Sequence, residues 1–594
     1  VQTWVAAPGR RHGPKSNQQA AVLTAILGIS CHYHDAAAAL LVDGQLVAAA
    51  EEERFTRNKH DSRFPTSAIE FALRQANITA DELDYVVFYE KPLSKFERLL
   101  TTSLHTVPGS WKMFQESVVS WLTEKLWIKG LIRDKVGFKN KNNILFSEHH
   151  LSHAASAYYC SPFDKSAVLT ADAVGEWATA TMGIGDGRRL QILEELKFPH
   201  SVGLLYSAFT AFLGFEVNDG EYKVMGMGAY GEPKYVDKVE KLINLSADGS
   251  FQLDLKYFSF PNSTSRMFNS RFEELFGQPR TAAESNNLEP YYADLAASVQ
   301  QVTEDILVKM ARHLRQRTGV NNICMAGGVA LNGLANHRIA REAGFEGVYI
   351  QPAAGDSGGA LGAALWAYHD VLGNDRDFKM DHSYWGSRTT DNEISEYLTT
   401  AGISFWEGAN EDQIIDHVVE SLSQGKVVGW YQGRAEWGPR ALGNRSILAD
   451  PRRVEMKDIV NEKVKFREPF RPFAPSMLAE RASEFVDLPG PEALSPSQFM
   501  LYVLPVKPEK TSVIPAVTHA DNTTRIQAVS QEANPLYHRL IQKFGAATGV
   551  PVVLNTSFNL RGDPIVDTPA TAYDTFIRCD IDSLVMGPFV CEKG

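Results

Sequence analysis

One local pattern of strands occurs twice in the sequence and limits the folds open to the chain. The pattern is two short apolar strands, a tight turn and a third strand, with Asp43-Gly44 and Asp186-Gly187 at the two turns. The two copies comprise residues 26–30, 36–42 and 45–50, and residues 167–171, 177–184 and 190–196. Because helical segments follow each copy, the pattern predicts an internal duplication.

Duplicated βββαβα halves around a cleft are typical of the actin and sugar-kinase type of ATPase fold. A chain of 594 residues is too long for one hydrophobic core. The predicted fold class is therefore α/β with two domains, an actin-like N-terminal domain and a second α/β domain. We expect a flexible leader over residues 1–20, the first domain over 21–374, a charged linker over 375–391 and the second domain over 392–594.

The composition is that of a soluble globular protein, with 44% hydrophobic and 22% charged residues and a net charge of -12. An acidic chain does not favour broad binding to nucleic acids or anionic membranes. No apolar run is long enough to span a bilayer, and the basic N-terminal segment lacks the apolar core of a signal peptide. The five scattered cysteines suit reduced thiols. We expect a cytoplasmic protein with no nucleic-acid partner, and a homodimer as the commonest oligomer.

A set of histidines and aspartates predicts a metal site. His149 and His153 lie four residues apart, which stacks two imidazoles on one face of a helix, and Asp172 and Asp356 each follow a strand-like apolar run. Two imidazoles with one or two carboxylates suit Fe(II), Mn(II) or Zn(II). The glutamate of a zinc-protease His-Glu-x-x-His helix is absent, which favours a metal that binds or orients a substrate. The alternative is a structural helix with a surface pair of histidines.

Three glycine-rich segments predict a nucleotide cleft. Gly327 and Gly328 follow a buried strand and precede a helix that begins near Asn332. Glycines there let backbone N–H groups approach a phosphate or ribose at a helix N-terminus. Residues 355–362 repeat the pattern, and Lys223 adds a cation beside a third glycine turn. Any one of these segments alone would fit tight packing equally well.

Basic residues gather among prolines and aromatic rings in the second domain, over residues 433–446 and 465–475. Prolines fix the backbone and rings exclude water, so these segments favour a rigid cradle for a multiply charged anion. In a third segment, Ser and Asn at alternate positions of an extended chain point to one side. The first two segments include Arg440, Arg445, Lys465 and Arg467, and the third contains Ser557 and Asn559.

Six motifs together resemble those of a known family. They are His34-Asp35-Ala36-Ala37, Glu51-Glu52-Glu53-Arg54-Phe55, His149-His150-Leu151-Ser152-His153-Ala154-Ala155-Ser156, Gly327-Gly328-Val329-Ala330-Leu331-Asn332, Trp437-Gly438-Pro439-Arg440-Ala441-Leu442-Gly443 and Arg471-Pro472-Phe473-Ala474-Pro475. The chain resembles the O-carbamoyltransferases of antibiotic tailoring and rhizobial nodulation-factor decoration from about Ile26 to the C-terminus. The resemblance implies a first domain similar to the actin-like tRNA threonylcarbamoyladenosine transferase and a second domain similar to threonylcarbamoyl-adenylate synthase.

The resemblance implies a two-step reaction that begins in the second domain. There, carbamoyl phosphate and ATP with Mg2+ would form carbamoyl adenylate and pyrophosphate. Lys465 and Arg467 match a Lys-x-Arg signature and would neutralise the phosphates of both substrates. Ser557 and Asn559 match a Ser-x-Asn signature and would bind the same carbamoyl phosphate. Further nucleotide contacts would come from Arg440 and Arg445.

The second step would take place in the first domain. His34 would deprotonate the acceptor hydroxyl, because neutral histidine is suited to that role near pH 7, and Lys59 would stabilise negative charge at the carbamoyl group. An Fe(II)-type ion or another divalent transition metal would bind the phosphate of the adenylate and favour AMP as the leaving group. The family's metal site maps onto His149, His153, Asp172 and Asp356, and its nucleotide contacts onto Gly327, Gly328 and Asn332.

The predicted function is ATP-dependent transfer of a carbamoyl group from carbamoyl phosphate to a hydroxyl of a sugar or natural product. Residues 99–137 lie outside the motifs and are the hypothesised place for acceptor specificity. A tRNA-modifying carbamoyl-type transferase is the first alternative, although such an enzyme needs a basic surface that binds the nucleic acid, and the acidic composition disfavours one. An actin-like ATPase or kinase, and a non-catalytic scaffold that binds nucleotide and metal, are the others.

Overall fold

The computed structural model describes most of the chain. The described residues are 23–105, 114–115, 121, 127–263, 265–281, 288–490 and 494–593. The leader predicted over residues 1–20 lies outside them, as does much of the segment 99–137. That segment contains the end of α3 (Pro92–His105) and the whole of α5 (Ile128–Val136).

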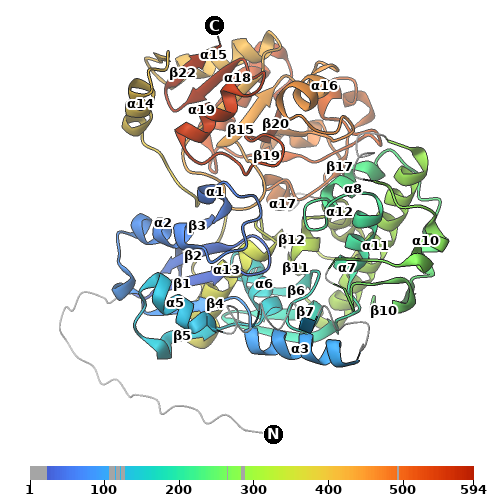
Figure 1. Ribbon diagram of the computed structural model, residues 1–594. Coiled ribbons are helices and arrows are strands. Elements are labelled where there is room, and N and C mark those ends of the chain that lie inside the picture. Colours follow the sequence, from blue (N-terminus) through green and yellow to red (C-terminus); the bar gives the residue numbers. More distant parts are fainter. Residues whose placement is uncertain are drawn as a thin grey trace.

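Each predicted copy of the strand pattern forms part of a five-stranded sheet (Figure 1). The first sheet has the order β3-β2-β1-β4-β5, and the second has the order β8-β7-β6-β11-β12. In each sheet the first three strands pair antiparallel and the other two extend the sheet in parallel, so the predicted duplication is confirmed. The strands are β1 (Ala25–Ser30), β2 (Ala37–Val42), β3 (Gln45–Glu51), β4 (Tyr85–Phe88), β5 (Ile144–Phe146), β6 (Lys165–Ala171), β7 (Ala178–Asp186), β8 (Arg189–Lys197), β11 (Asn322–Ala326) and β12 (Gly347–Ile350).

Local chemistry explains the hairpin between β2 and β3. Asp43 and Gly44 both have positive φ angles, of 49° and 76°. Two successive residues in this conformation make the kind of turn whose twist matches paired strands, and Asp-Gly adopts it at low cost. The alanine and leucine side chains of β2 are buried, which fixes the register of the strand.

Two helices join the two halves at the centre of the molecule. α6 (His149–Tyr158) packs on β6 and β11, α13 (Asp356–Trp366) packs on β1 and β2, and the two helices pack on each other. A Cβ atom added at Gly28 would overlap the carbonyl oxygen of Ala360, and one added at Gly362 would overlap that of Ser152. Glycine is therefore required for this close approach, which brings the start of α13 beside α6.

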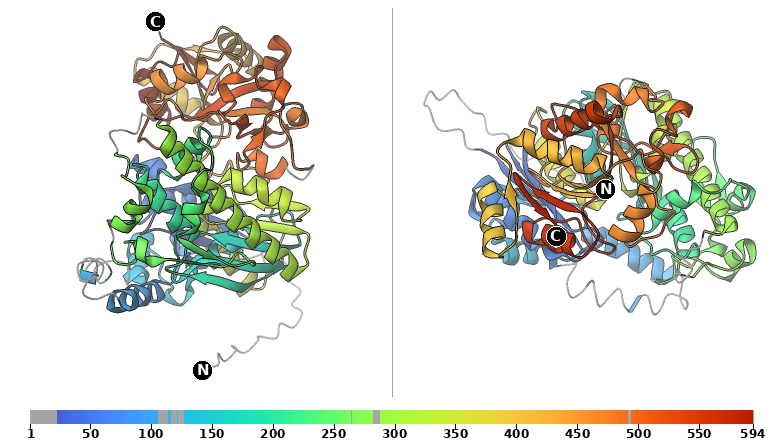
Figure 2. Two further views of the ribbon diagram at one scale, coloured as in Figure 1. Left: turned by 90° about the vertical axis from the view of Figure 1, so that its right-hand side faces the viewer. Right: turned by 90° about the horizontal axis from the view of Figure 1, so that it is seen from above.

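The later part of the chain forms a second α/β unit, as predicted, around an eight-stranded sheet of order β13-β22-β21-β14-β15-β20-β16-β19. Figure 2 shows it stacked on one side of the first two sheets. The helices α15 (Glu411–Ser423) and α18 (Pro535–Thr548) pack on each other and on this sheet. The exact domain boundaries stay predictions. The strands are β13 (Trp406–Glu407), β14 (Val428–Tyr431), β15 (Arg445–Ala449), β16 (Ala474–Leu478), β19 (Gln527–Val529), β20 (Val552–Ser557), β21 (Ser583–Met586) and β22 (Phe589–Glu592).

Buried contacts join the two units. Arg54 donates a hydrogen bond of 2.7 Å to the carbonyl of Gly438, and the N–H of Gly438 donates one of 2.8 Å to Glu51. A second contact between the units is made by Gly226 of α8 (Glu221–Gly228), which faces Pro472. A Cβ atom added at Gly226 would lie 3.3 Å from Cδ of Pro472. Both arrangements place first-domain residues directly against the basic segments of the second domain.

Further elements complete the described fold. Among the helices that the structure describes, none is long and apolar enough to cross a bilayer. The further helices are α1 (Glu53–Thr56), α2 (Thr66–Ala76), α7 (Val202–Phe212), α9 (Val236–Glu240), α10 (Ser270–Phe276), α11 (Pro290–Thr318), α12 (Gly333–Glu342), α14 (Asp391–Thr400), α16 (Met456–Ile459), α17 (Leu494–Gln498) and α19 (Pro569–Ile577). Two small hairpin-like pairs are β9 (Ile243–Leu245) with β10 (Phe251–Leu253) and β17 (Leu504–Pro505) with β18 (Thr523–Thr524).

Candidate active site

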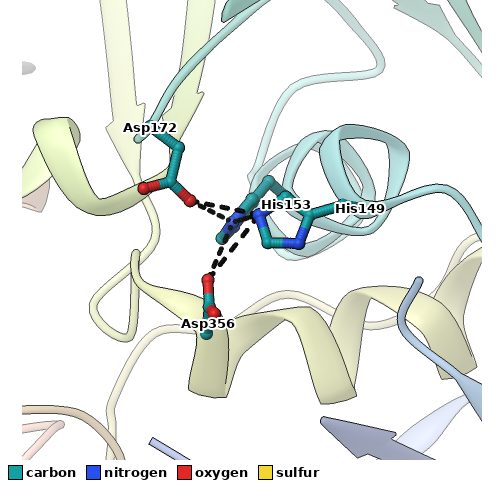
Figure 3. Close-up of side chains that lie close together, drawn as sticks. All are labelled: His149, His153, Asp172 and Asp356. Carbon is teal, nitrogen blue, oxygen red and sulfur yellow. Dashed lines mark hydrogen bonds and ion pairs between the residues drawn. The ribbon is translucent and has the colours of Figure 1, made fainter. Parts of the chain in front are cut away.

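The four predicted metal-ligating side chains meet between α6, β6 and α13 (Figure 3). His149 and His153 lie one turn apart on α6, so the predicted helical spacing is confirmed. Asp172 directly follows β6. The strand-end position predicted for Asp356 is wrong, because residues 351–355 form a turn after β12 and Asp356 is the first residue of α13.

The imidazole nitrogens and carboxylate oxygens of this group point at a common centre. Nε2 of His149 and Nε2 of His153 lie 3.2 and 3.0 Å from Oδ2 of Asp172. The same nitrogens lie 3.7 and 3.6 Å from Oδ1 of Asp356, and 3.1 Å from each other. The four side chains can thus offer one ligand atom each, all within 4.8 Å of one another.

The chemistry of this group fits a divalent metal. Burial alone would lower the pKa of His149, but Asp356 and Asp172 raise it to about 10, which shows how strongly the site favours positive charge. Two imidazoles and two carboxylates held on buried, regular elements form a donor set that suits Fe(II), Mn(II) or Zn(II). Which of these ions binds stays a prediction.

A second layer of carboxylates supports the histidines. Glu176 accepts a hydrogen bond of 3.1 Å from the backbone N–H of His149. Oε2 of Glu90 lies 3.8 Å from Nδ1 of His149 and 2.6 Å from Nζ of Lys95. A carboxylate near the outer nitrogen of a ligating histidine favours the tautomer whose inner nitrogen is free to bind.

The glycine turn predicted for the nucleotide lies beside Asp172. Gly327 has a φ angle of 93°, and a Cβ atom there would overlap the carbonyl oxygen of Ala171. A Cβ atom at Gly328 would lie 3.1 Å from Oδ1 of Asp172. Asn332 caps α12 by accepting from Ala335 N, and its amide also exchanges hydrogen bonds with Gln300. Asn332 is therefore already engaged, and the N–H of Gly327 donates to the carbonyl of Ala354 at 2.8 Å, whereas Gly328 lies directly beside Asp172.

The third predicted glycine turn is wrong. Residues around Lys223 form the helix α8, and Gly228 in that helix lets it approach the backbone of Ala297 in α11. Gly228 thus serves helix packing, and Gly226 a close approach to Pro472, rather than a phosphate-binding turn. Nζ of Lys223 lies 3.1 Å from Oδ2 of Asp219, the carboxylate that also contacts Lys59 and His60.

His34 and Lys59 lie at opposite ends of one hydrogen-bonded group. Nδ1 of His34 lies 2.7 Å from Oδ2 of Asp35, in the turn between β1 and β2. Nζ of Lys59 lies 2.5 Å from Oδ1 of Asp219, just before α8. His60 lies between the two pairs and connects them through Asp35 and Asp219.

Lys465, Ser557 and Asn559 meet in the second domain. Nζ of Lys465 donates to the carbonyl and Oδ1 of Asn559 at 2.7 and 2.6 Å, and to the carbonyl of Ser557 at 2.8 Å. Burial lowers the pKa of Lys465 well below its ordinary value, and the neighbouring Arg467 and Arg471 lower it further. An anion bound beside the Lys465 amine would favour its charged form and offset the cost of burying that charge.

The predicted arginines differ in their surroundings. Arg467 donates to Asn461 at 2.7 Å, and burial and Arg471 hold its pKa well below its ordinary value. Burial and Arg471 also lower the pKa of Arg440 to about 10. Arg445 is fully buried, and both of its terminal nitrogens donate to backbone carbonyls, among them that of Gln432 at 2.6 Å. The structure therefore gives Arg445 a role in holding the loop, and its contact with the nucleotide stays a prediction.

Three residues of this region received no role from the sequence. Burial, Arg440 and Arg471 hold the pKa of Arg525 well below its ordinary value. The guanidinium of Arg471 lies 5.0 Å from the ring centre of Tyr222, which comes from α8 of the first domain. Nε of Arg440 and Nε of Arg525 are buried without a hydrogen-bond partner in the described part of the chain. Arg471 lies in a quoted motif, whereas Arg525 and Tyr222 have no local signal that would have marked them.

Comparison with known proteins agrees with this arrangement. The family models described as carbamoyltransferase N-terminus and carbamoyltransferase C-terminus match residues 25–365 and 419–593. The chain is 37% identical to nodulation protein NolNO of Sinorhizobium fredii, over 94% of this chain and 79% of that protein. It is 38% identical to nodulation protein NolO of Bradyrhizobium diazoefficiens, over 75% and 78%, and 47% identical to an uncharacterized protein of Synechocystis sp., over 96% and 97%. The chain, with its two α/β units, belongs to the carbamoyltransferase family.

Proposed function

We propose that this carbamoyltransferase is an ATP-dependent O-carbamoyltransferase that uses carbamoyl phosphate as its donor. The observation that carries the proposal is a cluster of cations with little opposing charge. Glu468 is the carboxylate that pairs with Arg471, at 3.6 Å. The cations are Arg440, Lys465, Arg467, Arg471 and Arg525. Cations that lower one another's pKa are stabilised only when a multiply charged anion binds among them.

The first step would build carbamoyl adenylate in this cluster. Water releases inorganic phosphate from carbamoyl phosphate, and an oxygen of the resulting carbamate attacks the α-phosphorus of ATP. The bond between the α-phosphorus and the bridging oxygen breaks, which gives carbamoyl adenylate and pyrophosphate. Lys465 and Arg467 would reduce repulsion between the two anionic substrates, with Ser557 and Asn559 holding Lys465 in place.

The second step would transfer the carbamoyl group in the first domain. The acceptor hydroxyl oxygen attacks the carbamoyl carbon, its proton moves to Nε2 of His34, and the bond to AMP breaks. Nδ1 of His34 is committed to Asp35, so Nε2 is the nitrogen that takes the proton. Lys59 would lie near the carbamoyl group, and Gly327 and Gly328 would contact the nucleotide beside Asp172.

The two histidines and two aspartates of the metal-ligand group would bind a divalent ion. Such an ion supplies a positive charge that binds the adenylate phosphate and favours AMP as the leaving group. His149 and His153 would orient the ion through fixed positions on α6, and Asp172 and Asp356 would balance its charge. The acceptor would be a hydroxyl of a sugar or natural product.

The test is pyrophosphate release from the full chain supplied with ATP, Mg2+ and carbamoyl phosphate. We expect release that depends on carbamoyl phosphate and that falls at least about 100-fold in Lys465→Ala. Lys463→Ala is the matched control, because Lys463 is exposed two residues away and should leave the rate unchanged. Pyrophosphate release that is indifferent to carbamoyl phosphate would contradict the proposal.

A further inference from the structure

His60 lies between two carboxylates and takes no part in the steps above. It belongs to the loop between α1 and α2, with Nδ1 2.8 Å from Oδ1 of Asp35 and Nε2 3.0 Å from Oδ1 of Asp219. An imidazole with a carboxylate at each nitrogen is a donor at both, which is the doubly protonated form. Burial by itself would lower the pKa of His60, but the hydrogen bonds to Asp219 and Asp35 raise it to about 10.

Asp35 is shared between two histidines. Its Oδ2 bonds to His34 and its Oδ1 bonds to His60, so each oxygen faces one ring, and the ring centres lie 4.5 Å apart. The two histidines hold the pKa of Asp35 well below its ordinary value, although burial alone would raise it. Asp219 is likewise ionised beside His60, Lys59 and Lys223, which keep its pKa below its ordinary value against burial.

The backbone holds this arrangement under strain. Asp35 and His60 have φ angles of 41° and 56°, in a region that residues other than glycine seldom adopt. Backbone hydrogen bonds join their two loops, from His32 to Ser62 at 2.7 Å and from Ala36 to Asp61 at 2.8 Å. Strained residues persist where their surroundings over-determine them, and such residues concentrate at functional sites.

The charges around His34 explain why a second histidine is needed. Asp35 orients the His34 ring, and its negative charge together with that of Asp356 favours protonation of His34. A histidine that is already protonated cannot accept a proton from a hydroxyl. Burial and the positive charge of His60 both oppose that effect, but on balance Asp35 raises the pKa of His34 above its ordinary value. His60 therefore limits how far Asp35 favours the charged form of the ring.

We propose that His60, held in its cationic form by Asp219, is a positioning residue that shares the charge of Asp35 and opposes protonation of His34 while Asp35 orients its ring. The role given to His34 rests on the proposed function. The arrangement of charges itself does not, and it can be measured without any substrate.

The experiment measures the pH at which His34 becomes reactive. Diethyl pyrocarbonate modifies only unprotonated imidazole, so its rate at His34, followed by peptide mass spectrometry of the full chain between pH 5 and 10, gives the pKa of that side chain. In His60→Gln the midpoint should rise by about one pH unit, because Asp35 then acts on His34 alone. In Asp219→Asn it should rise as well, because His60 loses the partner that keeps it charged.

Two controls separate this inference from a structural effect. Asp61→Asn alters the same loop but removes side-chain contacts with Arg63 and Thr56 only. The midpoint for modification of His34 in this variant should therefore match that of the wild type. In Asp35→Asn the midpoint should fall, because the carboxylate that favours the charged ring is gone. Unchanged midpoints in both His60→Gln and Asp219→Asn would overturn the inference, even if pyrophosphate release supports the proposed function.

Discussion

Nζ of Lys465 lies 2.6 Å from Oδ1 of Asn559, and its charged neighbours Arg467 and Arg471 are both cations. The pair joins the loop before β16 to the end of β20. It holds the amine in a fixed position while burial and Arg467 disfavour its charge. The amine is therefore oriented for an anion before the anion arrives.

The first prediction concerns proton uptake. The pKa of Lys465 lies well below its ordinary value in the free protein, and an anion at the pocket favours the charged amine and raises that pKa. Binding of ATP with Mg2+ at pH 8 should therefore be accompanied by proton uptake. Calorimetric titrations in HEPES and in Tris, whose ionisation enthalpies differ, measure the uptake. Lys463→Ala should retain it and Lys465→Met should lose it; equal uptake in both variants would exclude Lys465 as the source.

The second prediction concerns Arg525. Its charge is disfavoured by burial and by Arg440 and Arg471, so it costs the free protein stability. Arg525→Leu should stabilise the free protein by about 1 kcal/mol while weakening pyrophosphate binding at least tenfold. Thermal unfolding with and without pyrophosphate checks both effects. Arg481→Leu, which removes an exposed arginine paired with Glu484, should leave the response to pyrophosphate intact. A destabilised Arg525→Leu that still binds pyrophosphate would contradict the argument.

The third prediction concerns the metal-ligand group. His153→Gln should lower the affinity for a divalent transition metal by more than about 100-fold, since even the loss of an outer partner costs 10–100-fold. His150→Gln is the control on the same helix, because Nδ1 of His150 bonds to Thr170 instead, at 2.7 Å. Metal content by plasma mass spectrometry measures the loss. Pyrophosphate release should survive in both variants, and its loss in His153→Gln alone would mean that the two sites are not separate.

The fourth prediction concerns the contact between Glu51 and Gly438. Burial raises the pKa of Glu51 from 4.5 to about 7. A folded-state pKa above the unfolded value means that the folded protein binds more protons, so this contribution is complete below pH 4.5 and is lost as the pH rises through 7. Between pH 5 and pH 8, the wild type should lose about 2.5 kcal/mol of stability relative to Glu51→Gln.

Urea unfolding at the two pH values measures this difference. Glu70→Gln is the control, because Glu70 is exposed and pairs only weakly with Arg74, at 3.9 Å. Its stability relative to the wild type should not change with pH. A pH-independent difference for Glu51→Gln would show that Glu51 is already ionised at pH 5.

Local patterns predicted the fold well because its strands carry their own signals. The turn at Asp43-Gly44 and the alternation around it fix a hairpin without reference to distant residues. The helical spacing of His149 and His153 was equally local. The position of Asp356 has no such local signal, because it depends on how α13 packs against its neighbours. The close contacts at Gly28 and Gly362 determine that packing.

The errors have a common physical cause. A glycine that permits close packing looks the same in sequence as one that admits a phosphate, so α8 was mistaken for a turn. A buried arginine that holds carbonyls looks the same in sequence as one that binds a ligand, so the sequence alone does not separate Arg445 from Arg440. Arg525 stands alone between two strands and shows its role only through the cations that surround it.

The contact between α8 and the basic pocket also constrains how such a protein can change over generations. Tyr222 and Gly226 are encoded in the first domain, yet they lie against Arg471 and Pro472 of the second. Residues of the two units therefore meet directly at this point. A larger side chain at position 226 would press against the ring of Pro472, because a Cβ atom there already lies 3.3 Å from its Cδ.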